Sequence, residues 1–167
     1  MKVWKGVCIF IAQVLFFATT SVSAQNDSLP AVYRQISALA DQYKGEKGVK
    51  MMICHDGFKL QTVKVMLRKE FGKEFVDNIK AFAIIFYGET ESSVAEKIVA
   101  EIEEITTPLQ KINIDAQLRP GAKGVGYVHL SEDGQILTDL LIVTELPSPK
   151  LIYFGGNFKP DKVQYKR

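Results

Sequence analysis

The stretch Ile79–Tyr87, IKAFAIIFY, is almost continuously apolar and rich in β-branched and aromatic residues. Gly88 follows it directly, and nine residues are too few to cross a membrane as a helix. A short apolar run of this composition favours a strand buried on both faces over a buried helical segment. We therefore expect this strand to lie inside the fold, with the other elements packed around it.

The N-terminal residues have the pattern of a targeting segment. Lys2 and Lys5 precede the apolar run Val7–Ala18, and Val22-Ser23-Ala24 then forms a cleavage site of the A-x-A kind. This order predicts a secretory signal peptide over residues 1–24, cleaved before Gln25. An uncleaved anchor is the alternative, but the run is shorter than the roughly 18 residues that a span requires.

The two cysteines bear on lipid attachment and on disulfides. Cys8 lies inside the apolar run and Cys54 lies far downstream, so neither follows the cleavage site as a lipoprotein cysteine would. We expect an exported protein, periplasmic or secreted, that carries no lipid and has no membrane span after cleavage. Cys54 is then the only cysteine left. It is either a buried small hydrophobic residue in a strand, which we favour, or a reactive or intermolecular thiol.

Composition excludes some partners. The 167 residues include 21 Lys and Arg and 19 Asp and Glu, and removal of Lys2 and Lys5 leaves 19 basic against 19 acidic residues. A chain without net charge offers no electrostatic basis for binding nucleic acid or an anionic membrane surface. Residues 25–158 are long enough for one domain with its own core, and residues 159–167 form a charged tail that we expect to fray.

Hydrophobic spacing predicts helices early in the mature chain and strands late. Ser93 and Glu96 have capping-box spacing before one helix, and Asp133-Gly134 marks a hairpin turn. The expected helices cover residues 31–43, 60–71 and 93–105, and the expected strands cover 49–54, 79–87, 112–118, 125–130, 136–144 and 151–154. The predicted fold class is α+β, a two-layer domain with about three helices on one face of a mostly antiparallel sheet of about six strands.

One cluster of chemically capable residues stands out, at Cys54, His55 and Asp56. Adjacent strand residues point to opposite faces, so Cys54 and His55 cannot form a nucleophile–base pair there. A metal site would need a further ligand, and the other histidine is His129 on an expected strand. We favour a turn with a surface histidine, and we assign no catalytic residue, metal or cofactor from the sequence.

Two features of the late strands are open to more than one interpretation. Asp139 interrupts the apolar run LTDLLIV, either as a buried functional carboxylate or, as we prefer, at an edge or polar face. Leu140–Val143 and Leu151–Phe154 are apolar on both faces. If helices cover one face, the other meets a partner or a second copy, unless the first helix or the segment with Phe158 covers it.

The succession of elements and the phrase YKGEKGVKMMIC at residues 43–54 resemble families of small exported domains in Bacteroidetes. The resemblance covers most of the mature chain and implies a periplasmic or envelope-associated accessory protein; it identifies no catalytic residues. Asp27-Ser28-Leu29 is also similar to the site at which exported Bacteroidetes proteins are O-glycosylated, which implies Ser28 as the acceptor. Ser28 is equally explained as a helix cap.

Two hypotheses on function follow. The first is an envelope domain that acts by binding another protein or by self-association. The second is a small-molecule- or ion-binding module, possibly a hydrolase, with a cleft near His55, Asp56 and His129. Convergence of these three side chains would favour the second hypothesis, whereas a separation of about 10 Å or more would exclude them as one site.

Overall fold

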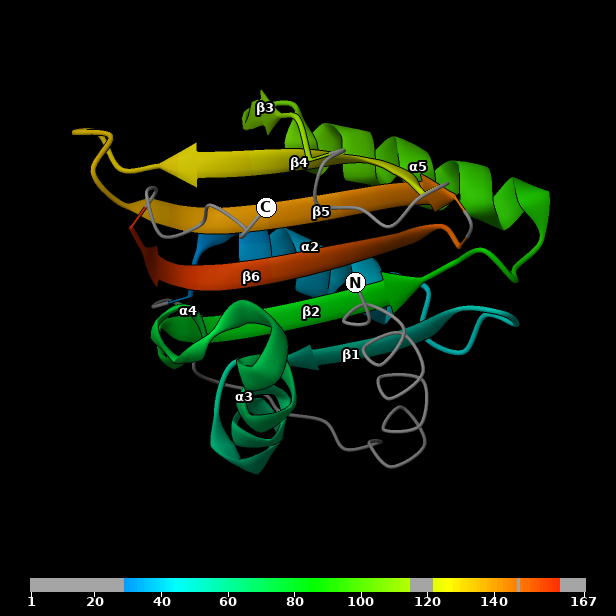
Figure 1. Cartoon of the computed structure of the whole chain (residues 1–167). Helices are drawn as coiled ribbons and strands as arrows, with labels where there is room; N and C mark the ends of the chain where they lie inside the picture. Colours follow the sequence, from blue (N-terminus) through cyan, green and yellow to red (C-terminus); the bar gives the residue numbers. More distant parts are fainter. Residues whose placement is uncertain (1–28, 115–121, 147, 160–167) are drawn as a thin grey trace.

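Helices and strands alternate in the first part of the chain, and every described element after α5 is a strand (Figure 1). The computed structural model describes residues 29–114, 122–146 and 148–159. The predicted signal peptide, Ser28 and residues 160–167 of the predicted tail lie outside the described residues. The elements are α2 (Ala31–Gln42), β1 (Lys50–Cys54), α3 (Gly57–Phe71), α4 (Lys73–Asp77), β2 (Ile79–Phe86), α5 (Ser92–Thr106), β3 (Gln110–Ile112), β4 (Lys123–Leu130), β5 (Leu137–Leu146) and β6 (Lys150–Phe158).

The six strands form one sheet in the order β1-β2-β6-β5-β4-β3, and every neighbouring pair is antiparallel. The expected α+β class, the strand number and the antiparallel pairing are therefore confirmed. The C-terminal strand β6 lies between β2 and β5, so it joins the β1–β2 pair to the meander of β3, β4 and β5.

The apolar run that begins at Ile79 forms β2, and it is buried on both faces as predicted. Ala81, Ala83 and Ile85 point to one side of the sheet, and Phe82 and Ile84 point to the other. None of the five is more than 1% exposed. A strand with two apolar faces requires cover on both, which explains why helices lie on each side of the sheet.

Helices α2 and α5 cover one face, behind the sheet in Figure 1. Their buried residues recur at helical spacing, as in Ile36 and Leu39 of α2 and Ile98 and Ile102 of α5. These side chains pack against the alternate strand residues that include Ala81, Leu141, Leu151 and Tyr153.

Helices α3 and α4 lie on the opposite face, in front of the sheet (Figure 1). We expected about three helices on one face, and the structure instead divides them between the two faces. Leu60, Val63 and Leu67 of α3 belong to the same cluster as Phe82, while Phe75 of α4 stacks on the ring of Phe158 with centroids 4.5 Å apart. The aromatic and β-branched face of β2 and β6 is thus covered mainly by α3 and α4 at this end of the sheet.

Two predicted boundaries are wrong. The helix α5 begins at Ser92 with Glu91 as its N-cap residue, so Ser93 lies within the first turn and is not the cap. The carbonyl of Glu91 accepts hydrogen bonds from the amides of Val94 and Ala95, which closes that turn without a side-chain cap. The strand β3 ends at Ile112, and residues 115–118 of the longer predicted strand lie outside the described residues.

The first described helix, α2, has a different cap residue from the predicted one. The N-cap residue of α2 is Pro30, not Ser28, although the helix itself covers most of the predicted range. In the parts of the chain that the structure describes, no helix combines the length and apolar content needed to cross a membrane.

Candidate functional site

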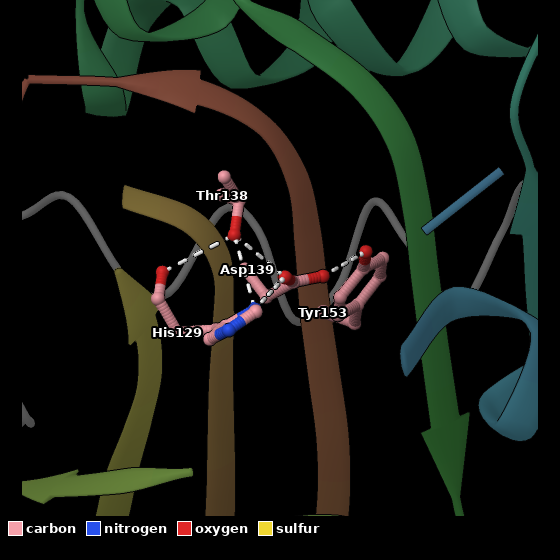
Figure 2. Close-up of polar contacts among 4 residues, drawn as sticks. All are labelled: His129, Thr138, Asp139 and Tyr153. Carbon is pink, nitrogen blue, oxygen red and sulfur yellow. Dashed lines mark hydrogen bonds and ion pairs between the residues drawn. The ribbon is translucent and has the colours of Figure 1, made fainter. Parts of the chain in front are cut away.

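A buried carboxyl group on β5 is the centre of the most connected polar cluster described (Figure 2). Asp139 is 2% exposed. Its Oδ1 accepts a hydrogen bond from the Tyr153 hydroxyl at 2.7 Å, and its Oδ2 accepts one from Thr138 Oγ1 at 2.9 Å. His129 Nδ1 lies 3.2 Å from the same Oδ2. Both carboxyl oxygens therefore have partners, as burial in an apolar layer requires.

Strand register explains why these side chains meet. Asp139 pairs directly with His129 on β4 and with Gly155 on β6. The register shifts between Leu137 and Asp139, so Thr138 lies in a bulge, and a bulge redirects side chains. At Gly155 a Cβ atom would overlap the Tyr153 hydroxyl, so the absence of a side chain there leaves room for that hydroxyl to reach Asp139.

The structure corrects the preferred interpretation of Asp139. We expected an edge or polar-face position, but β5 lies inside the sheet and Asp139 is buried on the face that α2 and α5 cover. The sequence contains one signal of this burial: Asp139 alternates in phase with Leu141 and Val143, which face the same side of the sheet. Its partners, however, come from strands whose order the sequence does not specify.

The arrangement fixes the hydrogen-bonding roles of its members. A carboxyl oxygen beside Nδ1 of His129 favours the tautomer that donates from Nδ1, which leaves Nε2 as an acceptor on a side chain that is 58% exposed. Burial and the nearby Asp139 raise the pKa of Tyr153 well above its ordinary value, so its hydroxyl remains a donor. The cluster can therefore present a single oriented imidazole at the surface.

The predicted cluster at the end of β1 lies apart from His129. His55 Nδ1 is 3.2 Å from the Tyr33 hydroxyl, and its Nε2 is 3.6 Å from the exposed carboxylate of Asp56. The ring of Tyr33 in turn contacts the ring of Tyr153, with centroids 5.9 Å apart. A series of contacts thus connects His55 to the Asp139 cluster through two tyrosines.

Cys54 and His55 point to opposite faces, as their adjacency predicts. Cys54 is buried in the cluster beneath α3, whereas His55 faces Tyr33 on α2. Burial raises the pKa of the Cys54 thiol to about 12, so almost no thiolate exists near neutral pH. The interpretation of Cys54 as a buried small hydrophobic residue is confirmed.

His55, Asp56 and His129 do not converge. The sheet order separates β1 from β4 by four strand spacings, which corresponds to roughly 19 Å. Among the described residues, no group of three His, Cys, Asp or Glu side chains is placed to hold a metal ion. The predicted residues therefore form two separate local contacts and not one catalytic or metal centre.

A different surface, which the sequence reasoning missed, lies on the outward side of α3. Phe58 is 85% exposed and Val65 is 69% exposed. They are seven residues apart and so lie on one side of the helix, with Thr62 between them and Lys69 one turn further on. We call Phe58, Thr62, Val65 and Lys69 the α3 stripe. Its signal in the sequence was an extra pair of apolar residues out of phase with Leu60, Val63 and Leu67.

Comparisons with protein-family models, with curated proteins and with solved structures gave no match for this chain.

Proposed function

We propose that this protein is an exported envelope domain that acts by binding another protein, a second copy of itself included, through the α3 stripe. The predicted signal peptide supports export, and the absence of net charge after its removal agrees with a protein partner over nucleic acid. The observation that carries the proposal is the exposure of Phe58 and Val65 on one side of a helix whose other side is packed.

An aromatic residue that is 85% exposed is unusual in a folded domain, because large apolar side chains gain about 1.5–3 kcal/mol from burial. Two exposed apolar residues that lie two turns apart on one side of a helix form a binding face of the kind that partner helices and grooves recognise. The inward residues Leu60, Val63 and Leu67 already anchor α3 to the sheet. The outward residues are therefore available for a partner without loss of the fold.

Neither apolar face of the late strands is open to a partner. We expected one face of the last strands to lie open, but Leu140 and Phe154 are buried on one side and Leu141 and Leu151 on the other, each at 1% exposure or less. Within the described residues, the two most exposed large apolar side chains, Phe58 and Val65, lie on a helix.

The alternative, a small-molecule or ion site near His55, Asp56 and His129, has weaker support. These residues lie on strands or turns about four strand spacings apart, so one ligand of ordinary size cannot touch all three. What remains of this alternative is the single imidazole of His129, which Asp139 orients.

A photo-crosslinking amino acid at position 58 in the native host tests the proposal. We expect a specific crosslinked band from position 58 and none from position 136, because Ile136 is an exposed apolar residue at 39% on the β4–β5 hairpin and is not part of the α3 stripe. Substitution of Val65 by Ser should remove the band, since it halves the apolar face. Intact mass of the same native sample reports whether residues 1–24 have been cleaved. No crosslink from position 58 to any protein would contradict the proposal.

A further inference from the structure

A groove lies on the opposite side of the molecule from the α3 stripe. It has a volume of about 470 Å³ and lies between α5 and the ends of β2 and β5. Its apolar walls include Tyr87, Val99 and Pro149. The residues that line it are Tyr87, Gly88, Thr90, Ser92, Ala95, Glu96, Val99, Ala100, Glu103, Glu145 and Pro149. We call this surface the α5 groove.

The α5 groove is acidic. Glu96, Glu103 and Glu145 contribute three carboxylates, and no lysine, arginine or histidine lines it. Within the described ranges, none of the three forms an ion pair, although Glu145 helps burial to raise the pKa of Tyr87 to about 12. Three unpaired carboxylates around an apolar floor favour a partner that brings both apolar side chains and positive charge.

The α3 stripe has this chemistry. Phe58 and Val65 lie two turns apart on its outward side, and Lys69 follows one turn after Val65. The apolar residues of the stripe are spaced i and i+7, and the groove side of α5 has Ser92, Glu96, Val99 and Glu103 at the same helical spacing. Val99 is itself 39% exposed, so an apolar contact is available on both sides.

The two surfaces cannot meet within one molecule. The inward residues of α3 pack on the face of the sheet that bears Phe82, and those of α5 pack on the opposite face (Figure 1). A contact between them therefore joins one copy to another, and the two copies use different surfaces. Such a heterologous contact leaves a free stripe at one end and a free groove at the other, so it can add further copies.

We propose that the α3 stripe of one copy docks into the α5 groove of the next, so that the protein assembles head to tail. This inference rests on the proposed function and specifies a second copy as the partner. Phe58 and Val65 cover the apolar wall with Val99, and Lys69 lies toward the carboxylate rim. The balanced charge of the mature chain removes the long-range repulsion that would oppose such self-assembly.

Complementation between two variants tests the inference. Phe58→Asp disables the stripe and leaves the groove intact, whereas Glu96→Lys with Glu103→Lys reverses the groove charge and leaves the stripe intact. In sedimentation velocity over a concentration series, we expect the native protein to form a growing series of oligomers. Each variant alone should associate about tenfold or more weakly. An equimolar mixture should form a 1:1 dimer and nothing larger, because one stripe and one groove remain.

Matched controls keep the result specific. Ile136→Asp and Glu132→Lys introduce the same changes at exposed positions of the β4–β5 hairpin and should leave association unchanged. All substituted side chains are exposed, and circular dichroism melting will show that each variant is folded. Added salt should weaken the native association, since the charges lie at a solvent-exposed rim.

The outcomes separate this inference from the proposed function. A native protein that stops at a symmetric dimer, or a mixture that stays monomeric while the native protein associates, would overturn head-to-tail assembly. A native protein that remains monomeric would also overturn it, whereas a crosslink from position 58 to a different protein would still support protein binding through the stripe.

Discussion

At the scale of single residues, Asp139 shows how an apolar strand can hold a polar group. Its carboxyl oxygens are satisfied by Tyr153 and Thr138, with His129 at the outer edge. Each unsatisfied buried polar atom would cost about 1–3 kcal/mol, so the cluster stabilises the fold only while its members remain together. The residues should therefore behave as one unit when they are substituted.

We predict that Tyr153→Phe has opposite effects in two backgrounds. In the native protein it should destabilise by about 1–2 kcal/mol, because Asp139 Oδ1 loses its donor. Asp139→Ala should cost about 2–4 kcal/mol, because it leaves the Tyr153 hydroxyl buried without an acceptor. Tyr153→Phe added to Asp139→Ala should then be neutral or stabilising.

Urea unfolding of the four proteins measures this cycle. Tyr127→Phe is the control. Tyr127 of β4 lies on the same face of the sheet as Tyr153, but the hydroxyl that donates to Asp139 is that of Tyr153. Strict additivity of Asp139→Ala and Tyr153→Phe would show that the two residues do not act as a unit.

The local sequence predicted the burial of Cys54 but not the burial of Asp139, and the difference has a physical reason. A cysteine at the end of an apolar run such as Met51–Ile53 can be buried whichever strand lies beside it. The burial of Asp139 depends on partners that are 10 and 14 residues away, and on a bulge and a glycine that let them approach. Local pattern contains no information on which strands are neighbours, so this part of the candidate site could not be predicted.

At the scale of elements, the connection from α2 to β1 depends on a close approach of two backbones. Gly48 has φ of +84°, and a Cβ atom there would overlap the backbone carbonyl of Glu89, which follows β2. The Lys50–Glu89 ion pair at 2.8 Å lies beside this approach, but both side chains are exposed and it contributes little. The close backbone approach at Gly48 therefore contributes more than the ion pair to the position of β1 against β2.

We predict that Gly48→Ala destabilises much more than Gly45→Ala. Gly45 is the matched control, because it lies in the same turn at φ of +96° with no atom near the position of a Cβ. Gly45→Ala should cost about 1–2 kcal/mol from backbone strain alone, whereas Gly48→Ala should cost about 3 kcal/mol or more. Thermal unfolding of both variants measures the difference, and equal costs would show that the Gly48–Glu89 approach is loose.

The existence of most elements was predictable from spacing, but their boundaries and their sides of the sheet were not. Leu60, Val63 and Leu67 identified α3, and the nearly continuous apolar run from Ile79 identified β2. The start of α5 was misplaced because Ser93 and Glu96 have capping-box spacing while the chain begins the helix at Ser92. Whether α3 packs in front of or behind the sheet depends on tertiary packing, which helical spacing does not specify.

At the scale of the whole molecule, two apolar layers enclose several titratable side chains whose burial disfavours the charged form. Burial raises the pKa values of Tyr33, Tyr87 and Tyr153 above the ordinary 10.0, and that of Cys54 above the ordinary 9.0. Cys54 lies in the core on one face of the sheet, and the three tyrosines lie in the core on the other face. Ionisation of these groups would therefore destabilise both cores.

We predict that the free energy of unfolding falls as the pH rises above about 9. In the unfolded chain these groups ionise near their ordinary pKa values, whereas in the folded chain they keep their protons, so the unfolded state binds fewer protons and stability decreases with pH. The stabilisation is fully present below about pH 9 and is lost progressively above it.

Urea unfolding from about pH 8 to about pH 11 measures the slope. Cys54→Ala removes one of the raised groups and should make the slope less steep, even though the variant begins from a lower stability because of the lost packing. A free energy of unfolding that does not change over this range would show that the buried groups ionise equally in both states.

The position of β6 determines whether this sheet can be completed. Among the described elements, β6 comes latest in the sequence, and it joins the β1–β2 pair to the β3–β4–β5 meander. Without residues 150–158, the β1–β2 pair and the β3–β4–β5 meander each keep an unpaired edge, so the two parts of the sheet have no strand to connect them.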